Sequence, residues 1–283
     1  MIGILYNPRV ARAYPLADEI ATWVEQRGQK TQICTASEAP AALDWQETDL
    51  VVTLGGDGSI LRAARAAAPY DAPILRINLG RVGFLTEAEP ETWQSVVSQT
   101  LSGDYWVEER MMLQASVHRN GATVMERTDA LNDVVTGRGA RARVVHLHTE
   151  IDGGHLATYV ADGLIVATPT GSTAYALAAG GPVMPPQLRN ILLIPVAPHL
   201  SMARPVVLSE GVAVRIVVTG GRPAVLTVDG EMQAELENGD HVQVEASPHV
   251  ARFARVQDKN YFYKTLVARL VPRKQTSNSE LET

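Results

Sequence analysis

Residues Leu50 to Leu54 form a run of valine, leucine and threonine that passes without a break into Gly55-Gly56-Asp57-Gly58-Ser59. A helix-forming run rich in alanine, Ile60 to Ala68, follows at once. A short strand with almost no charged or strongly polar position is typical of a strand buried on both faces. Because a strand that leads directly into a helix reaches its next neighbour by a crossover, the pairing is expected to be parallel. The sequence therefore predicts an α/β layer in this part of the chain.

The same alternation of strand and helix signals fills the first hundred residues. Further short strands are predicted at Ile2–Tyr6, Thr31–Thr35 and Ile74–Leu79. Apolar side chains recur on one helical face at Leu16, Ile20, Trp23 and Val24, and again at Trp93, Val96, Val97 and Leu101. Gly28 and Gly103 follow these two segments and indicate where each helix stops.

From about Trp106 the pattern changes to short β-branched runs separated by turn pairs. Asn120-Gly121 is a strong signal for a two-residue hairpin, and Asp152-Gly153-Gly154 and Gly220-Gly221 are comparable. We therefore expect residues 105 to 250 to be mostly antiparallel β-structure in two packed sheets. After them, Tyr261 to Leu266 is predicted to form a helix that packs back on the first domain.

These patterns divide the chain into three parts. Residues 1–104, joined by about 255–273, are predicted to form the α/β domain that carries the Gly-Gly-Asp-Gly loop. Residues 105–254 are predicted to form the β-rich domain, and the polar tail 274–283 is predicted to be disordered.

Length and charge exclude several classes of protein. The chain has 283 residues, 46% hydrophobic and 20% charged, which suffices for a sizeable core and excludes a mostly disordered chain. Its net charge of −6 argues against a nucleic-acid partner, because a phosphate backbone favours a basic surface. The single cysteine, Cys34, excludes a disulfide framework and favours a cytoplasmic location. We expect no membrane segment or signal peptide, since the apolar start ends at Asn7-Pro8.

The loop Gly55-Gly56-Asp57-Gly58 has the composition of a phosphate-binding turn. Glycines let a ligand approach the main chain closely, and the amides at the start of the following helix favour anions. A carboxylate at the centre would repel phosphate unless it takes a proton from an attacking hydroxyl or helps to hold a cation. Asp57 is therefore a candidate catalytic base. The alternative is an ordinary turn in which Asp57 caps the helix.

Two other segments could bind a nucleotide. A buried strand ends at Thr168-Pro169, Gly171 turns the chain, and Thr173 to Ala179 can form a short helix that presents hydroxyl groups and the Tyr175 ring. Those groups suit a ribose, a base edge and a ring, and the alternative is a tight structural turn with a core tyrosine. Asn132-Asp133, at a predicted strand start, could bind ribose or an amino group, or could form a turn.

Other patterns that carry chemistry are weaker. Neither the common P-loop G-x-x-x-x-G-K-S/T nor the hydrolase elbow G-x-S-x-G occurs. Gly137 to Ala142 fits the dinucleotide pattern G-x-G-x-x-A, but strands are predicted after it where that pattern requires a helix. His146 and His148 share a strand face without a third ligand, so no protein-held metal is predicted.

Taken together, these segments resemble the NAD kinase family, and the resemblance spans most of the chain. Gly55 to Ser59 resembles the family's Gly-Gly-Asp-Gly-Thr, with Ser59 in place of threonine. Leu131-Asn132-Asp133 resembles its Asn-Glu/Asp motif, and Asp162-Gly163 with Thr168 to Tyr175 is very close to its longest signature. Pro198-His199, Ala203-Arg204-Pro205 and Val228-Asp229-Gly230 follow in the family's order.

The resemblance implies a fold and an activity. The fold would be an N-terminal Rossmann-like α/β domain and a C-terminal β-sandwich domain that binds NAD, with the C-terminal segment returning to the first domain. The activity would be phosphoryl transfer to the adenosine ribose 2′-hydroxyl of NAD, giving NADP. ATP, or polyphosphate in some members, would be the donor, with Mg²⁺ or another divalent metal accompanying ATP. Members are usually homodimers or homotetramers.

The resemblance also implies the site residues. Asp57 would be the catalytic base, within a phosphate loop of Gly55, Gly56, Gly58 and Ser59. Contacts to NAD would come from Gly58, Asn132, Asp133, Asp162, Thr173, Ala174 and Tyr175. Arg62, Phe84, Arg143, Ala178, Asp229 and Glu231 would lie near the dinucleotide.

Two other functions remain open at this point. A lipid kinase of the diacylglycerol or sphingoid type shares the glycine motif, but it would need an apolar acceptor slot and a basic or amphipathic membrane-facing surface. A non-catalytic dinucleotide sensor could have the same fold, although the intact Asp57 argues against it.

Overall fold

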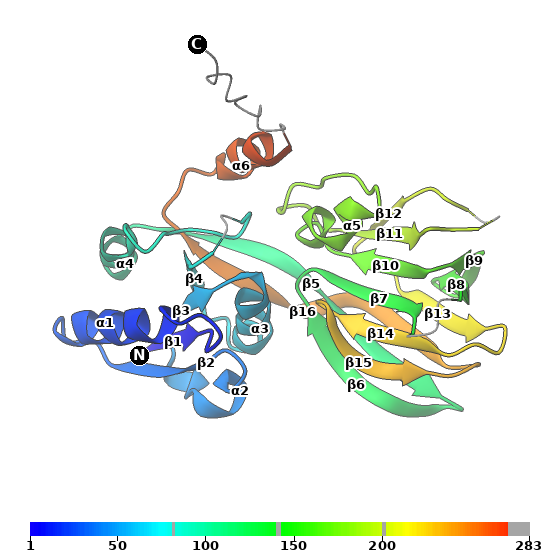
Figure 1. Ribbon diagram of the computed structural model, residues 1–283, viewed down its shortest axis with the longest axis horizontal. Coiled ribbons are helices and arrows are strands. Elements are labelled where there is room, and N and C mark those ends of the chain that lie inside the picture. Colours follow the sequence, from blue (N-terminus) through cyan, green and yellow to red (C-terminus); the bar gives the residue numbers. More distant parts are fainter. Residues whose placement is uncertain (81–82, 140–142, 200–201, 271–283) are drawn as a thin grey trace, which may run out of the picture.

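The structure is a computed structural model that describes residues 1–80, 83–139, 143–199 and 202–270. Figure 1 shows helices and parallel strands on one side of the molecule, stacked β-sheets on the other, and the C-terminal helix above them. The helices are α1 (Ala13–Glu25), α2 (Ala39–Ala42), α3 (Asp57–Ala67), α4 (Trp93–Leu101), α5 (Tyr175–Ala178) and α6 (Tyr261–Leu270). Short 3-10 turns occur at Trp45–Glu47, Ala68–Tyr70 and Gly171–Thr173.

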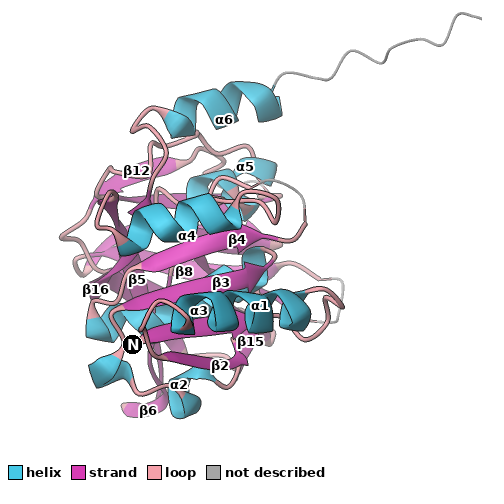
Figure 2. Ribbon diagram, turned by 90° about the vertical axis from the view of Figure 1, so that its left-hand side faces the viewer, coloured by secondary structure: helices cyan, strands magenta, loops and turns pink. Residues whose placement is uncertain are grey.

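The N-terminal α/β part is a parallel sheet between two layers of helices. Its strands are β1 (Ile2–Tyr6), β2 (Thr31–Thr35), β3 (Leu50–Gly55) and β4 (Ile74–Asn78), in the order β2-β1-β3-β4. One core joins α1 and α4 to Ile4 and Val52 of the sheet, and Figure 2 shows these two helices in front of the strands. A second core joins α2 and α3 to the opposite face, through Leu5 and Val51. The predicted Rossmann-like layering is confirmed.

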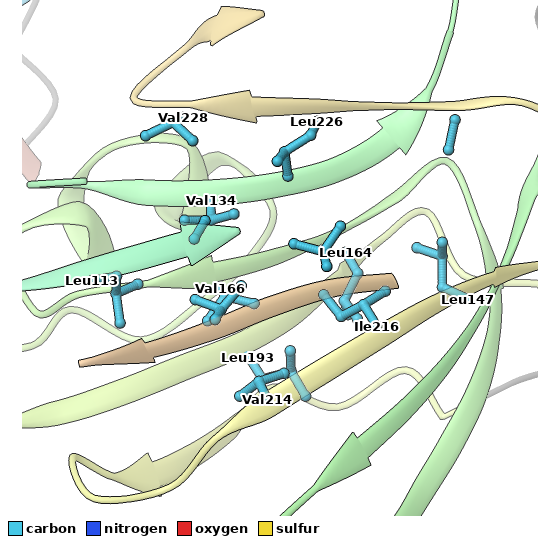
Figure 3. Close-up of a cluster of buried hydrophobic side chains, with 14 of the residues drawn as sticks. Leu113, Val134, Leu147, Leu164, Val166, Leu193, Val214, Ile216, Leu226 and Val228 are labelled. Atoms are coloured by element: carbon cyan, nitrogen blue, oxygen red, sulfur yellow. The ribbon is translucent and has the colours of Figure 1, made fainter. Parts of the chain in front are cut away.

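The C-terminal part is a β-sandwich, as predicted. Its strands are β5 (Trp106–Arg119), β6 (Ala122–Ala130), β7 (Asp133–Arg138), β8 (Val145–Ile151), β9 (Gly154–Ala161), β10 (Gly163–Ala167), β11 (Asn190–Val196), β12 (Val206–Ser209), β13 (Val214–Thr219), β14 (Ala224–Val228), β15 (Glu231–Leu236) and β16 (His241–Arg255). One sheet has the order β12-β11-β10-β7-β14-β15. It faces β5, β8, β13 and β16 across an apolar core that includes Leu113, Leu147, Leu164, Val166 and Ile216 (Figure 3).

Strand β16 joins the two parts into one sheet. It pairs antiparallel with β5 from His241 to Arg255, with a register shift between Ala246 and Val250. Near its end Phe253 also pairs in parallel with Ile74 of β4. Within the described residues, the strands of the N-terminal sheet therefore continue into one face of the β-sandwich as a single ten-stranded sheet. The long β5 and β16 ribbons that cross between the two halves are visible in Figure 1.

The turn predictions were right at two of three places. Asn120 and Gly121, and likewise Asp152 and Gly153, have positive φ angles and close the hairpins β5–β6 and β8–β9. The Gly220-Gly221 hairpin was wrong, because β13 lies in the ten-stranded sheet and β14 in the other. That turn passes between sheets. The hairpin partner of β14 is β15, and its turn is Asp229-Gly230, with φ angles of 51° and 78°.

Two helix boundaries also differ from the prediction. Helix α3 begins at Asp57, before the predicted start at Ile60, because Gly56 takes the extended conformation of an N-cap residue. The predicted helix Thr173–Ala179 is a 3-10 turn, Gly171–Thr173, followed by the four-residue α5. Tyr175 is thus the first residue of its helix.

A buried ionic cluster lies where β5, β16 and the C-terminal segment meet. Glu108 accepts hydrogen bonds from Arg110 Nη2 at 3.0 Å, Arg255 Nε at 2.9 Å and the Tyr261 hydroxyl at 2.9 Å. Arg255 Nη1 also donates to Glu87 Oε2 at 2.8 Å. Glu87, Glu108 and Arg255 are each only 1% exposed at the side chain. Because Tyr261 opens α6, this cluster fixes the returning C-terminal segment against the sheet.

The C-terminal segment contacts the first domain as predicted. The Glu87 carboxylate accepts the backbone amides of Val256 and Gln257, at 2.6 and 2.7 Å, and Phe262 of α6 packs 5.7 Å from the Phe84 ring. The tail 274–283, for which disorder was predicted, lies outside the described residues, as does part of the Gly137 to Ala142 pattern. Over the part of the chain that is described, no helix has the length and apolarity needed to cross a membrane.

Candidate active site

The glycine-rich loop holds Asp57 at the start of α3. A Cβ atom on Gly55 would lie 2.5 Å from Ser59 Oγ, so the loop can be this tight only with glycine there. The Asp57 side chain is 71% exposed, and its Oδ1 lies 2.8 Å from Nη1 of Arg76, which is 1% exposed. No side-chain hydrogen bond caps this helix. The capping alternative is therefore wrong, and the carboxylate is turned toward a buried guanidinium with its other side open to a ligand.

A second turn closes beside the carboxylate. The Gly83 amide donates to Thr86 Oγ1 at 2.9 Å, and a Cβ atom on Gly83 would lie 3.1 Å from Asp57 Oδ1. Because Gly83 has no side chain, the turn can approach Asp57 this closely. The half-buried Phe84 follows Gly83 directly, and its ring centroid lies 5.7 Å from that of Phe262.

The two segments that are candidates for nucleotide binding pack against each other. The Thr168 amide donates to the Asn132 carbonyl at 2.9 Å, and Thr168 Oγ1 donates to the Leu131 carbonyl at 2.6 Å. A Cβ atom on Gly171 would collide with the Asn132 carbonyl oxygen. Thr168 and Ser172 are fully buried, so their hydroxyl groups serve the turn. Asn132 and Thr173 stay half-buried beside it, within reach of a ligand.

Asp229 holds the backbone of the Asn132 segment. Its carboxylate accepts the amides of Leu131 at 3.0 Å, Asn132 at 2.7 Å and Asp133 at 3.3 Å. Burial, together with the Asp229 charge, raises the pKa of Asp133 to about 7. Burial also raises the pKa of Asp229, but the three amides and Arg65 oppose that rise. The Asp133 carboxyl therefore takes up a proton as the pH falls through about 7.

Asp162 and Tyr175 line a hollow of about 440 Å³ on the outer face of the six-stranded sheet. Tyr175 is 47% exposed, so the alternative of a core tyrosine is wrong. Arg138 Nε lies 3.2 Å from Asp162 Oδ1 at one wall. Ala174 is half-buried and Ala178 exposed beside Tyr175. Arg143 lies apart from these residues, in an adjoining hollow of about 560 Å³.

Arg62 and Glu231 meet directly. Arg62 Nε lies 2.6 Å from Glu231 Oε1, and Arg65 Nη2 lies 2.6 Å from Glu231 Oε2. Together with Arg65, they line a cavity of about 600 Å³ between α3 and β15.

Sequence reasoning missed two arginines of the site. Arg76 stands in the middle of the predicted strand Ile74–Leu79, and a charged residue on a strand buried on both faces signals a paired charge. Arg65 follows Arg62 at three residues, which places both on one face of a helix. Both signals indicate that a partner exists, but neither identifies it.

Comparison with known proteins identifies the family of the chain. The family model of the ATP-NAD kinase N-terminal domain matches residues 29–105. The family model of the ATP-NAD kinase C-terminal domain matches residues 131–256. The NAD kinase of Chloroflexus aurantiacus is 41% identical over 272 residues, covering 95% of this chain and 98% of the relative. The chain belongs to the ATP-NAD kinase family. The NAD kinase of Citrifermentans bemidjiense is 40% identical over 276 residues, covering 92% of this chain and 95% of the relative.

Solved structures of the family share the fold. An NAD kinase from Archaeoglobus fulgidus, crystallised with ATP, is 26% identical, with a TM-score of 0.75 over 94% of this chain and 96% of that one. Yeast NADH kinase, crystallised with NADH, has a TM-score of 0.83 over 97% of this chain and 89% of that chain, at 23% identity. The predicted combination of an α/β domain and a β-domain is thus the fold of this family.

Proposed function

We propose that this chain is an NAD kinase that transfers the γ-phosphoryl group of ATP to the adenosine ribose 2′-hydroxyl of NAD. The observation that carries the proposal is Asp57, which is exposed at the N-terminus of α3 while a buried arginine holds its Oδ1. The lipid kinase and the dinucleotide sensor are not favoured, because the chain matches ATP-NAD kinases along both of its parts.

The proposed mechanism relies on position and charge. The amides of Asp57 and Gly58 at the N-terminus of α3 favour the donor phosphates, which the helix dipole also attracts, while the Ser59 amide donates to the Gly56 carbonyl at 3.2 Å. The ribose hydroxyl is a weak acid, so Asp57 takes its proton late in a loose transition state. Mg²⁺, or another divalent metal carried in by ATP, would neutralise phosphate charge, and Asp57 is the carboxylate of this loop that it could meet. In the described ranges no cluster of three or more metal-ligating side chains was found.

We propose that the acceptor is held mainly by the β-rich part, together with Gly58 of α3. The residues proposed to contact NAD are Gly58, Asn132, Asp133, Asp162, Thr173, Ala174 and Tyr175. The packing of the Thr168–Gly171 turn on Asn132 and the open face of Tyr175 support this assignment. Phe84, Arg143 and Ala178 are proposed to lie at the edge of the site. The carboxylates of Asp229 and Glu231 are already bound by protein groups, which supports a role in holding the site together.

We further propose a cytoplasmic homodimer or homotetramer. The outer strands β12 and β15 of the six-stranded sheet carry Val207 and Met232, which are 53% and 66% exposed. An open sheet edge presents unpaired backbone groups that another chain can pair with. We also propose that residues 1–104 with about 255–273 form one domain and residues 105–254 form the other.

The test is NADP formation from NAD, ATP and Mg²⁺, detected with a dehydrogenase strictly dependent on NADP. In Asp57→Asn we expect kcat to fall by about 10²- to 10⁴-fold, because the base is lost. NAD affinity should stay level or improve, because the negative charge that repels phosphate is lost as well. Asp71→Asn is the matched control, since Asp71 is 72% exposed and also pairs with an arginine, Arg252, far from the loop. A folded Asp57→Asn protein that makes NADP near the wild-type rate would eliminate Asp57 as the base.

A further inference from the structure

Two arginines of helix α3 bind the Glu231 carboxylate. Arg62 places both Nε and Nη2 at 2.6 Å from Glu231 Oε1, and Arg65 places Nη2 at 2.6 Å from Oε2. Each carboxylate oxygen therefore has its own guanidinium. Burial alone would raise the pKa of Glu231, but the bonds from Arg65 and Arg62 hold it below its ordinary value. The carboxylate is thus charged at neutral pH, and both of its oxygens are already engaged.

The two arginines share a rigid element with the candidate base. Asp57 is the first residue of α3, and Arg62 follows it five residues later. At about 1.5 Å of rise per residue, the two lie about 7.5 Å apart along the helix axis. An α-helix of this length moves as one body, so whatever holds Arg62 and Arg65 also holds Asp57.

The other end of the contact leads to the acceptor segment. Glu231 is the first residue of β15, two residues after Asp229 in the β14–β15 turn. The Asp229 carboxylate accepts the Leu131 and Asn132 amides, and the Asp229 amide donates to the Asp133 carbonyl at 2.9 Å. The turn that carries Glu231 is thus hydrogen-bonded to the segment proposed to bind NAD.

We infer that Glu231 is a positioning residue. Its ion pairs with Arg62 and Arg65 set the placement of Asp57 relative to the Asn132 segment. The inference rests on the proposed kinase function and makes specific the role first expected of Arg62 and Glu231, which was a place near the dinucleotide. Phosphoryl transfer depends on alignment of donor, acceptor hydroxyl and base. A contact that links the helix of the base to the acceptor segment therefore affects the rate of phosphoryl transfer more than the binding of either substrate.

The test compares Glu231→Gln, Arg65→Gln and the double variant in steady-state and single-turnover assays. We expect kcat and the single-turnover rate of Glu231→Gln to fall about tenfold, since a misplacement on the order of 1 Å can cost up to about a hundredfold. KM for NAD and for ATP should stay within about twofold. Arg65 binds Glu231 and also acts on the Asp229 carboxylate, so its variant should lose at least as much, and the double variant should lose little more than Arg65→Gln alone.

Glu210→Gln is the matched control. Glu210 is 30% exposed and pairs with Arg189, 47% exposed, while Glu231 is 36% exposed beside the 47% exposed Arg62. The Arg189–Glu210 pair lies by the edge strand β12, and within the described residues the side-chain hydrogen bonds of both join only each other. Its loss should leave kcat and both KM values unchanged. Since these pairs are partly exposed, the variants are expected to fold, and melting temperatures will verify it.

Three results would overturn the inference. A raised KM for NAD with unchanged kcat would mean that Glu231 contacts the dinucleotide. A lowered melting temperature with an unchanged single-turnover rate would mean that the pair only stabilises the fold. Losses that multiply in the double variant would mean that the two side chains act separately. If the unmodified protein forms no NADP, the proposed function itself fails, which is seen before any variant is made.

Discussion

The buried ionic cluster around Glu108 makes a quantitative prediction for Arg255→Met. The cluster contains two carboxylates, Glu87 and Glu108, and two guanidiniums, Arg110 and Arg255, so it is neutral as a whole. Methionine keeps much of the apolar volume of Arg255 but removes one cation. Two carboxylates, each 1% exposed, are then left with one guanidinium between them.

Breaking a buried pair by removing one partner costs about 3–5 kcal/mol, because the remaining charge is neither solvated nor paired. At about 2–4 °C per kcal/mol for a chain of this size class, the melting temperature should fall by about 6–20 °C. Arg189→Met is the control for an arginine in a partly exposed pair, and we expect it to cost less than about 1 kcal/mol.

The pH dependence provides a second readout. Burial alone would raise the pKa of Glu108, but Arg110, Arg255 and the Tyr261 hydroxyl together hold it below its ordinary value. In the wild-type protein this ionisation therefore stabilises the fold above the pKa of an unfolded glutamate and is lost at lower pH. Without Arg255 the carboxyl takes up a proton more readily, so the destabilisation should be largest at neutral pH and shrink toward pH 5.

Thermal melting of both variants from pH 5 to 8 checks these expectations. Adding Glu108→Gln to Arg255→Met removes the excess negative charge and should recover part of the lost stability. If Arg255→Met melts within a degree or two of Arg189→Met at every pH, the cluster does not hold the C-terminal segment as described.

Three further predictions follow from the site. Tyr175→Ala should raise KM for NAD more than it lowers kcat, because stacking is present in both ground and transition states; an unchanged KM would exclude the ring from the site. The Asp133 carboxyl has a pKa of about 7 in the folded protein, so its contribution to stability should be lost as pH rises from about 4 through 7. The melting temperature of Asp133→Asn should lack this pH dependence, and an equal dependence in both proteins would refute the assignment. Gly171→Ala should weaken NAD binding in calorimetry and lower the melting temperature, because the new Cβ meets the Asn132 carbonyl; normal affinity would show that the two segments are not coupled.

Local structure in this chain could be read from the sequence because its causes are local. The strands Ile2–Tyr6 and Thr31–Thr35 and the helix end at Leu101 occur where the apolar pattern predicts them. The loop between β3 and α3 follows from the glycines, since a Cβ on Gly55 would contact Ser59. Hairpins closed by Asn120-Gly121 and Asp152-Gly153 follow from residues that tolerate positive φ angles.

Partners distant in sequence could not be read in the same way. Gly220-Gly221 has the composition of a hairpin turn, but whether the flanking strands pair depends on which sheet each one joins. The pairing of Asp57 with Arg76, and of Glu231 with Arg62 and Arg65, depends on how whole elements pack. A charged residue in an apolar strand signals that it is paired, but the identity of the partner is a property of the tertiary fold.

The shared sheet also bears on the order in which this chain can fold during synthesis. Strand β4 is made early, but its neighbour on one side, β16, is among the last segments to be translated. Until then the N-terminal strands have an open edge at Ile74, and β5 lacks its longest partner. A nascent chain therefore cannot complete the ten-stranded sheet before β16 has been made. A chain cut short before His241 would leave β4 and β5 each with an edge that β16 covers in the full chain.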